Sequence, residues 1–257
     1  MRTIRSLAVL VITTTAITSA QRATTFTDDD LDRNVATQVA ALSSQLKVNA
    51  ADASEWRRRE AEIKAVTDRL RINVDRHIES AMRPEEGSQR IEARLRTVLA
   101  GHSPNPEYGD GPLARVADVR AGRSLVVAYT VVRGPHHDTA SIRGYRSDFG
   151  RFQFVAATGD DFDGYNMFKS SLVSPLADEF WLLAWGQAQT FNGKKVRFRI
   201  YSFDGQTFKT VWQPDDLLNA TVQITQTGFT IERETKEPPF AIRDQYALTA
   251  NGPIKVN

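Results

Sequence analysis

The chain has 257 residues, of which 41% are hydrophobic and 25% are charged, and it contains no cysteine. This composition is typical of a globular protein and excludes a disulfide scaffold, thiolate metal sites, cysteine catalysis and a collagen-like or disordered chain. The 33 Lys and Arg residues nearly balance the 31 Asp and Glu residues. The balance predicts no nucleic-acid partner, because such a surface needs a surplus of basic side chains.

The first twenty residues have the pattern of a secretory signal peptide. A basic head ends at Arg5, an apolar stretch follows over residues 7–17, and small residues occupy positions 18–20. The apolar stretch is shorter than the ~20 residues needed to cross a bilayer. We therefore expect residues 1–20 to be removed on export, leaving a soluble periplasmic or extracellular protein that does not insert into the membrane.

Residues 21–101 are predicted to form a helical module, a hairpin or a bundle of three helices. In the first helix the apolar residues recur every three or four positions: Leu31, Val35, Val39, Leu42 and Leu46. A second run opens at Ser54 and stops at Pro84, and a third extends from Ser88 to Gly101. Each apolar stripe must be buried, so we expect this module to bind a protein partner or to self-associate.

The proline- and glycine-rich residues 102–118 are interpreted as a linker. Residues 119–257 are predicted to form an all-antiparallel β domain. Apolar and charged residues alternate over 195–200, and Asn-Gly or Asp-Gly dipeptides, typical of hairpin turns, occur at 192–193, 204–205 and 251–252. The expected fold class is therefore α+β, with the helices and strands segregated along the chain.

An internal repeat is indicated inside the β domain. At an offset of 56, residues 125–160 align without a gap to residues 181–216, with matches that include Arg143/Arg199, Tyr145/Tyr201 and the aromatic pair Tyr129/Trp185. Each unit is predicted to be a four-stranded antiparallel meander like a propeller blade, with a partial third unit. The predicted fourth strands are 166–173 and 220–226, and the partial unit covers 229–234, 241–248 and 254–256.

Two to three such units are fewer than the ~4 blades that close a propeller. We therefore expect the units to pack as a sandwich or a twisted open sheet. A ring completed by oligomerisation, a barrel, or a sheet edge covered by the helices are alternatives.

Two short motifs were considered as metal sites. Residues 160–164, Asp-Asp-Phe-Asp-Gly, superficially resemble a calcium loop, but position 165 is Tyr where a third alternating carboxylate is expected. His136, His137 and Asp138 offer zinc-ligand chemistry, but adjacent residues point in different directions and too few ligands lie nearby. We interpret both as polar turns.

Catalytic motifs are similarly weak. Ser44 and Lys47 match a bare Ser-x-x-Lys inside a predicted helix, and Asp178-Glu179 is a carboxylate pair without a supporting motif. A sugar-stacking platform is conceivable from Trp181, Trp185 and Trp212, but their apolar surroundings favour core packing.

No catalytic, cofactor-binding or metal-ligating residue is assigned, and no cofactor is expected. We favour an exported, non-catalytic binding or assembly protein. The alternatives are a secreted hydrolase that cleaves extracellular or cell-wall polymers with dispersed carboxylates, and a calcium-stabilised lectin-like module.

Overall fold

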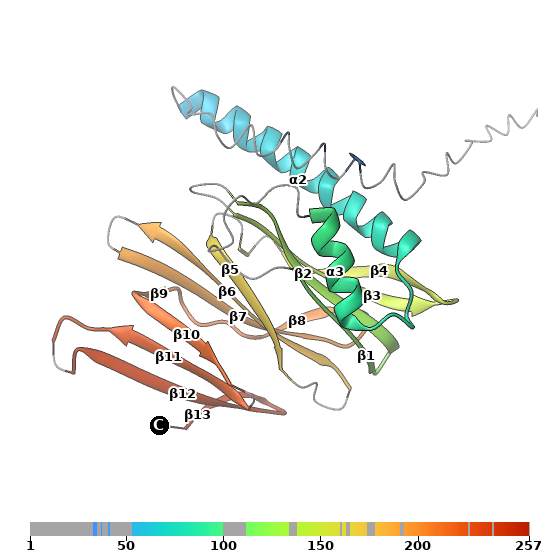
Figure 1. Cartoon of the computed structure of the whole chain (residues 1–257). Helices are drawn as coiled ribbons and strands as arrows, with labels where there is room; N and C mark the ends of the chain where they lie inside the picture. Colours follow the sequence, from blue (N-terminus) through green and yellow to red (C-terminus); the bar gives the residue numbers. More distant parts are fainter. Residues whose placement is uncertain are drawn as a thin grey trace, which may run out of the picture.

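The computed structural model describes residues 33, 34, 37, 41, 53–99, 112–133, 138–159, 161–162, 165–173, 178–190, 193–225, 227–237 and 239–256. The predicted signal peptide lies outside this part of the chain, as does almost all of the predicted first helix. Within the described part, two helices precede three antiparallel sheets, so the protein is α+β with a β-rich C-terminal part (Figure 1).

The helices are α2 (Ala53–Ala81) and α3 (Ser88–Leu99). The first sheet contains β1 (Leu113–Val119), β2 (Gly122–Arg133), β3 (Asp138–Asp148) and β4 (Arg151–Ala157). The second contains β5 (Asn166–Val173), β6 (Phe180–Thr190), β7 (Gly193–Phe203) and β8 (Phe208–Trp212), with β9 (Leu217–Leu218) added beside β7. The third contains β10 (Ala220–Ile224), β11 (Gly228–Glu234), β12 (Ala241–Thr249) and β13 (Gly252–Lys255).

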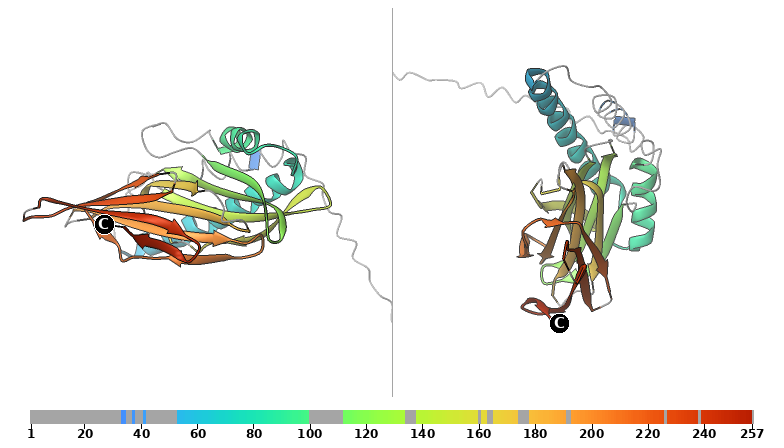
Figure 2. Two further views of the ribbon diagram at one scale, coloured as in Figure 1. Left: turned by 90° about the horizontal axis from the view of Figure 1, so that it is seen from below. Right: turned by 90° about the vertical axis from the view of Figure 1, so that its left-hand side faces the viewer.

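The three sheets form successive layers, and the helices cover the outer face of the first (Figures 1 and 2). Three hydrophobic cores fill the spaces between layers. The first joins both helices to the first sheet, the second lies between the first and second sheets, and the third lies between the second and third sheets. One end of the stack is therefore covered by helices, while the third sheet is the last layer at the other end.

The apolar stripes predicted for the second and third helices are present and pack against the first sheet. Leu70, Val74 and Ile78 of α2 and Ile91 and Leu95 of α3 are fully buried against the first sheet. This burial removes the reason for expecting the second and third helices to offer their apolar faces to another protein. Neither described helix has the combination of length and apolarity that spanning a membrane requires.

Helical side chains also satisfy backbone groups at both edges of the first sheet. Glu92 Oε1 and Ser88 Oγ of α3 accept hydrogen bonds from the backbone N–H groups of Ala114 and Val116 on β1, at 2.9 and 3.0 Å. At the opposite edge, Glu79 Oε1 of α2 accepts the N–H of Phe154 on β4 at 2.9 Å. Unpaired edge groups invite pairing with other chains, so the helices protect both edges.

The last part of the predicted linker is a strand, while residues 102–111 lie outside the described part of the chain. Residues 113–118 form most of β1 rather than a connecting segment. Because α2 and α3 share a core with this sheet, the described helices and the first sheet pack as one body.

The division of strands among units also differs from the prediction. Strand β5, expected to complete the first meander, pairs with β6, and β10, expected to complete the second, pairs with β11. The strands predicted as a partial third unit combine with β10 into a full sheet. The strand predicted to complete each meander therefore belongs to the next sheet.

The hairpins β3–β4 and β7–β8 share one register. Tyr145 lies opposite Phe154 and Tyr201 opposite Thr210, both at an offset of 56, and each hairpin has its irregularity immediately before the tyrosine. Across β2 and β6, however, the offset is 57, because Tyr145 faces Leu125 whereas Tyr201 faces Leu182.

The change of offset follows from one extra residue, which a bulge between Thr130 and Val132 accommodates in β2. One residue of slip exchanges the two faces of a strand. The sequence match of Tyr129 with Trp185 is therefore wrong, since Tyr129 packs toward the helices while Trp185 packs toward the third sheet.

Candidate functional site

A cavity of about 290 Å³ lies where α2 crosses the ends of β3 and β4. Residues 68, 71 and 72 of α2, residues 140–143 of β3 and residues 157–159 at the end of β4 line it. A concave site with apolar walls and a few convergent polar groups is the usual form of a small-molecule site. The cavity is therefore the first candidate for a functional site.

A buried ion pair adjoins the cavity through its lining residue Arg143. Asp75 of α2 faces Arg143 of β3, and its carboxylate accepts hydrogen bonds from Nε at 2.5 Å and from Nη2. The same carboxylate accepts the hydroxyl of Tyr145 at 2.6 Å. Asp75 is 6% exposed and Arg143 is 9% exposed, so the three groups fix the helix to the sheet in water-poor surroundings.

One nitrogen of Arg143 remains available. Its guanidinium lies over the ring of Phe154, with Cζ 4.3 Å from the ring centroid. Nε and Nη2 both face Asp75, and Nη1 has no hydrogen-bond partner among the described residues. Arg143 lines the cavity, and Nη1 is the one guanidinium nitrogen that Asp75 does not bind.

A second arginine borders the cavity and is engaged in several hydrogen bonds. Arg71 donates from Nε to Ser141 Oγ at 2.7 Å and from Nη2 to the carbonyl oxygen of Ala140 at 3.1 Å. Its Nη1 lies 3.4 Å from Asp68, which also pairs with Lys64 at 3.2 Å. Asp68 therefore places a partly exposed, partly neutralised negative charge among the lining residues.

The ionisation states of these groups are strongly biased. Burial raises the pKa of Tyr129 and of Tyr145 well above the usual range, so both hydroxyls stay protonated at neutral pH. Burial acts to lower the pKa of Arg143, but hydrogen bonding to Asp75 outweighs it and raises the pKa above its ordinary value. The arginine and both tyrosines therefore hold fixed protonation states, which suits binding better than proton transfer.

The hairpin tip between β3 and β4 is a second unusual feature. Phe149 is 98% exposed and has a φ of 45°, and Gly150 follows with a φ of 74°. Two consecutive positive φ values are those of a tight hairpin turn, for which Asn and Gly are preferred. A bulky aromatic residue here is both strained and solvated, a combination that folding does not require.

The predicted calcium loop is only partly described. Asp160, Asp163 and Gly164 lie outside the described residues. Asp161 accepts the hydroxyl of Tyr201 through Oδ2 at 2.5 Å and the Nη1 group of Arg197 through its backbone oxygen at 2.5 Å. In the described part of the chain, no three His, Asp or Glu side chains group as metal ligands do.

The equivalent acidic turn of the second unit is an ion-pair centre. Asp216 pairs with Arg197 at 2.9 Å and with Lys195 at 2.8 Å, and it accepts the hydroxyl of Tyr165 at 2.8 Å. Burial acts to raise the pKa of Asp216, but the hydrogen bonds from these three side chains lower it well below its usual range. This carboxylate therefore stabilises the fold in its charged form.

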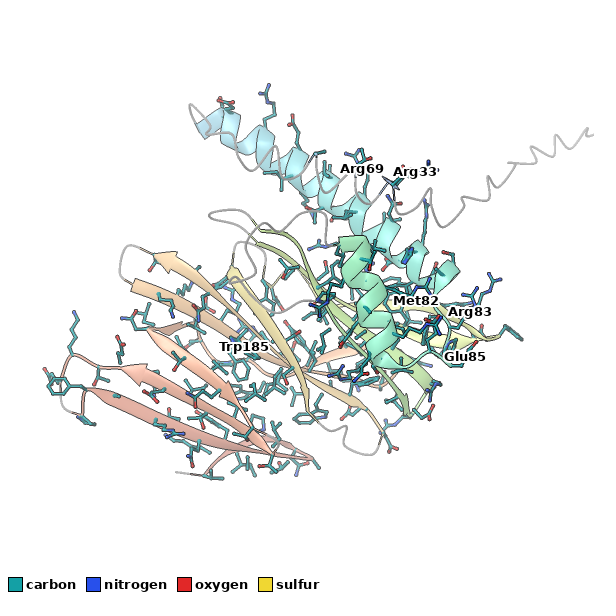
Figure 3. All side chains as sticks on the ribbon, viewed as in Figure 1. Arg33, Arg69, Met82, Arg83, Glu85 and Trp185 are labelled. Carbon is teal, nitrogen blue, oxygen red and sulfur yellow. The ribbon has the colours of Figure 1, made fainter. Side chains whose placement is uncertain are left out.

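The structure disperses the other residues considered from the sequence. Asp178 contributes a backbone oxygen to Arg120 N, and Glu179 accepts Trp181 Nε1 at 3.3 Å; neither residue lines the cavity. Trp181, Trp185 and Trp212 pack in or against the third core, which supports the core interpretation (Trp185 is labelled in Figure 3). Ser44, Lys47, His136 and His137 lie outside the described residues, and Asp138 begins β3.

Asp75 was not predicted as a functional residue from the sequence, and Arg143 was noted there only as a position of the internal repeat. One signal was available, because Arg71 and Asp75 each follow a stripe residue of α2, Leu70 and Val74, at the border of the buried face. Comparisons with models of known protein families, with curated proteins and with solved structures give no match. The site must therefore be interpreted from its own chemistry.

Proposed function

We propose that this chain is an exported, non-catalytic binding or assembly protein whose β3–β4 hairpin tip inserts into an apolar recess of a partner protein. The observation that supports this role is the exposed Phe149 at a positive φ. A left-handed conformation costs a non-glycine residue on the order of 1–2 kcal/mol. Strain at an exposed position motivates a functional hypothesis, since neither packing nor turn formation explains it.

An isolated, fully exposed aromatic ring is also the type of side chain that dominates the free energy of protein binding. Interface hot spots are enriched in large side chains that fill a pocket of the partner. A tight hairpin holds such a ring at low entropic cost. The interaction surface proposed here replaces the apolar faces of α2 and α3, which the first sheet already covers.

The experiment compares Phe149→Gly with Phe240→Ser, which changes another exposed phenylalanine, 68% accessible and distant in sequence. Phe149→Gly should raise the melting temperature, because the strain is relieved, and should abolish cross-linking to the partner from a photoreactive residue at position 151. Phe240→Ser should leave that cross-link intact. A Phe149→Gly protein that still forms the same cross-linked product would contradict the proposal.

We also infer that β1–β4 and β5–β8 are two copies of one ancestral meander arranged like successive propeller blades. This inference is supported by the shared register and irregularity of β3–β4 and β7–β8. It is also supported by the equivalent tyrosines, each of which donates its hydroxyl to an aspartate outside its own meander, Tyr145 to Asp75 of α2 and Tyr201 to Asp161 before β5. Such a stack presents hairpin tips at its rim, where a partner can reach them.

The alternatives have less support. A hydrolase of the expected kind needs two carboxylates facing one cleft, and among the residues that the structure describes Asp68 alone contributes a carboxylate to the cavity lining. For the calcium-stabilised lectin-like module, the described part of the loop already engages Asp161 with Tyr201.

A further inference from the structure

We infer that the cavity between α2 and the ends of β3 and β4 binds the carboxylate of a small organic acid, which accepts hydrogen bonds from Nη1 of Arg143. This site is separate from the hairpin tip and does not depend on the role proposed for Phe149. The tip and the cavity lie at opposite ends of the β3–β4 hairpin, since the turn is at residues 149–150 and the cavity is lined by residues 140–143 and 157–159.

The geometry of the guanidinium supports an anionic ligand. Arg143 is nine-tenths buried, and its Nε–Nη2 edge is held by Asp75. In a planar guanidinium Nη1 then points away from that carboxylate and retains two N–H groups for another acceptor. Charge-assisted hydrogen bonds to a carboxylate are roughly twice as strong as neutral ones, so this donor favours a carboxylate over a neutral carbonyl.

The charge balance favours a single negative charge. Arg143 is already paired with Asp75, and Arg71 is close to Asp68. Since the two arginines are offset by two carboxylates, the site offers one free donor group rather than a cationic cluster. A phosphate dianion needs more donors than this and would be repelled by Asp68. The arrangement therefore fits a monocarboxylate.

The walls and the volume indicate what the carboxylate is attached to. Ile72 and Ala157 are apolar lining residues, and Ala140 and Ile142 line the cavity from β3 while their side chains pack in the second core. The volume of about 290 Å³ is just below the range usual for ligand pockets, about 300–1,000 Å³. A short aliphatic chain or a single ring bearing one carboxylate matches these dimensions.

The test uses benzoate as the probe, with phosphate and chloride at the same ionic strength as comparison anions. Isothermal titration should show saturable benzoate binding by the full mature chain, and benzoate should raise the melting temperature more than either comparison anion. Ala157→Leu, which narrows the cavity directly opposite Arg143 and leaves both residues of the ion pair in place, should weaken benzoate binding at least tenfold.

Asp68→Asn provides a change in the opposite direction. Removing this negative charge should strengthen benzoate binding about two- to fivefold, as expected for one partly exposed charge. The matched control is Asp118→Asn, a carboxylate 75% exposed on β1, which should leave the affinity unchanged. Ala157→Leu and Asp68→Asn keep the Arg143–Asp75 pair, and a thermal melt of each variant establishes that it is folded.

Three results would overturn the inference. The first is the absence of saturable benzoate binding. The second is equal stabilisation by phosphate and benzoate, which would indicate a general anion effect. The third is unchanged benzoate affinity in folded Ala157→Leu and Asp68→Asn, which would place benzoate elsewhere on the protein.

Discussion

Replacing Asp75 with alanine removes the carboxylate that joins α2 to the first sheet. The change leaves the Arg143 guanidinium charged in a position that is 9% exposed. It also removes the acceptor of the Tyr145 hydroxyl, now bonded at 2.6 Å. Breaking a buried pair by removing one partner costs about 3–5 kcal/mol. The total free energy of unfolding of a domain is only about 5–15 kcal/mol, so Asp75→Ala should lose a large fraction of the stability.

The assay is equilibrium urea unfolding followed by tryptophan fluorescence. A double variant, Asp75→Leu with Arg143→Met, removes both charges and should recover most of the loss, because well-packed apolar pairs often equal or exceed a buried ion pair in stability. If Asp75→Ala lowers the free energy of unfolding by less than about 1 kcal/mol, the pair is solvated. If the double variant is no more stable than Asp75→Ala, the loss does not arise from an unpaired buried charge.

Two further predictions concern packing and pH. A Cβ added at Gly144 would lie 2.5 Å from Cε2 of Phe203, so Gly144→Ala should lower the free energy of unfolding by about 1–3 kcal/mol. Phe203→Leu in the same chain should restore part of this loss. A urea midpoint that Gly144→Ala leaves unchanged would contradict this packing. The pKa of Asp216 is lowered in the folded state, so its stabilising effect is present above the ordinary pKa of about 3.9 and is lost as the pH falls below it. The urea midpoint should therefore fall in acid less steeply in Asp216→Asn than in the unmodified chain, and identical slopes would show that this group does not contribute.

Much of the fold could be predicted from periodicity. The helical runs after Ser54 and Ser88 and the change to alternating residues beyond position 119 correspond to α2, α3 and the sheets. The sequence offset also located the common register of β3 and β7, because turn length and side-chain pattern together specify a hairpin. It could not locate the one-residue slip in β2, since a bulge leaves no composition signal.

The candidate site could not be predicted in the same way. Asp75 and Arg143 are 68 positions apart, and their pairing depends on how α2 crosses the first sheet. An ungapped local pattern carries no information about that crossing. The repeated Arg-x-Tyr pattern includes Arg143 and Tyr145, but it does not predict that Asp75 accepts hydrogen bonds from both. The exposure and positive φ of Phe149 depend on the hairpin turn that the strands impose, which no sequence pattern singled out.

The helical contacts at β1 and β4 have a practical consequence for dissecting the protein. A fragment starting at residue 112 would lack Ser88, Glu92 and Glu79. It would present two open β edges together with the uncovered face of Leu125 and Tyr129. Such a fragment should polymerise in solution, whereas a chain cleaved between residues 99 and 112 should stay assembled as a non-covalent complex. The helices thus prevent the edges and the outer face of the first sheet from associating with other chains.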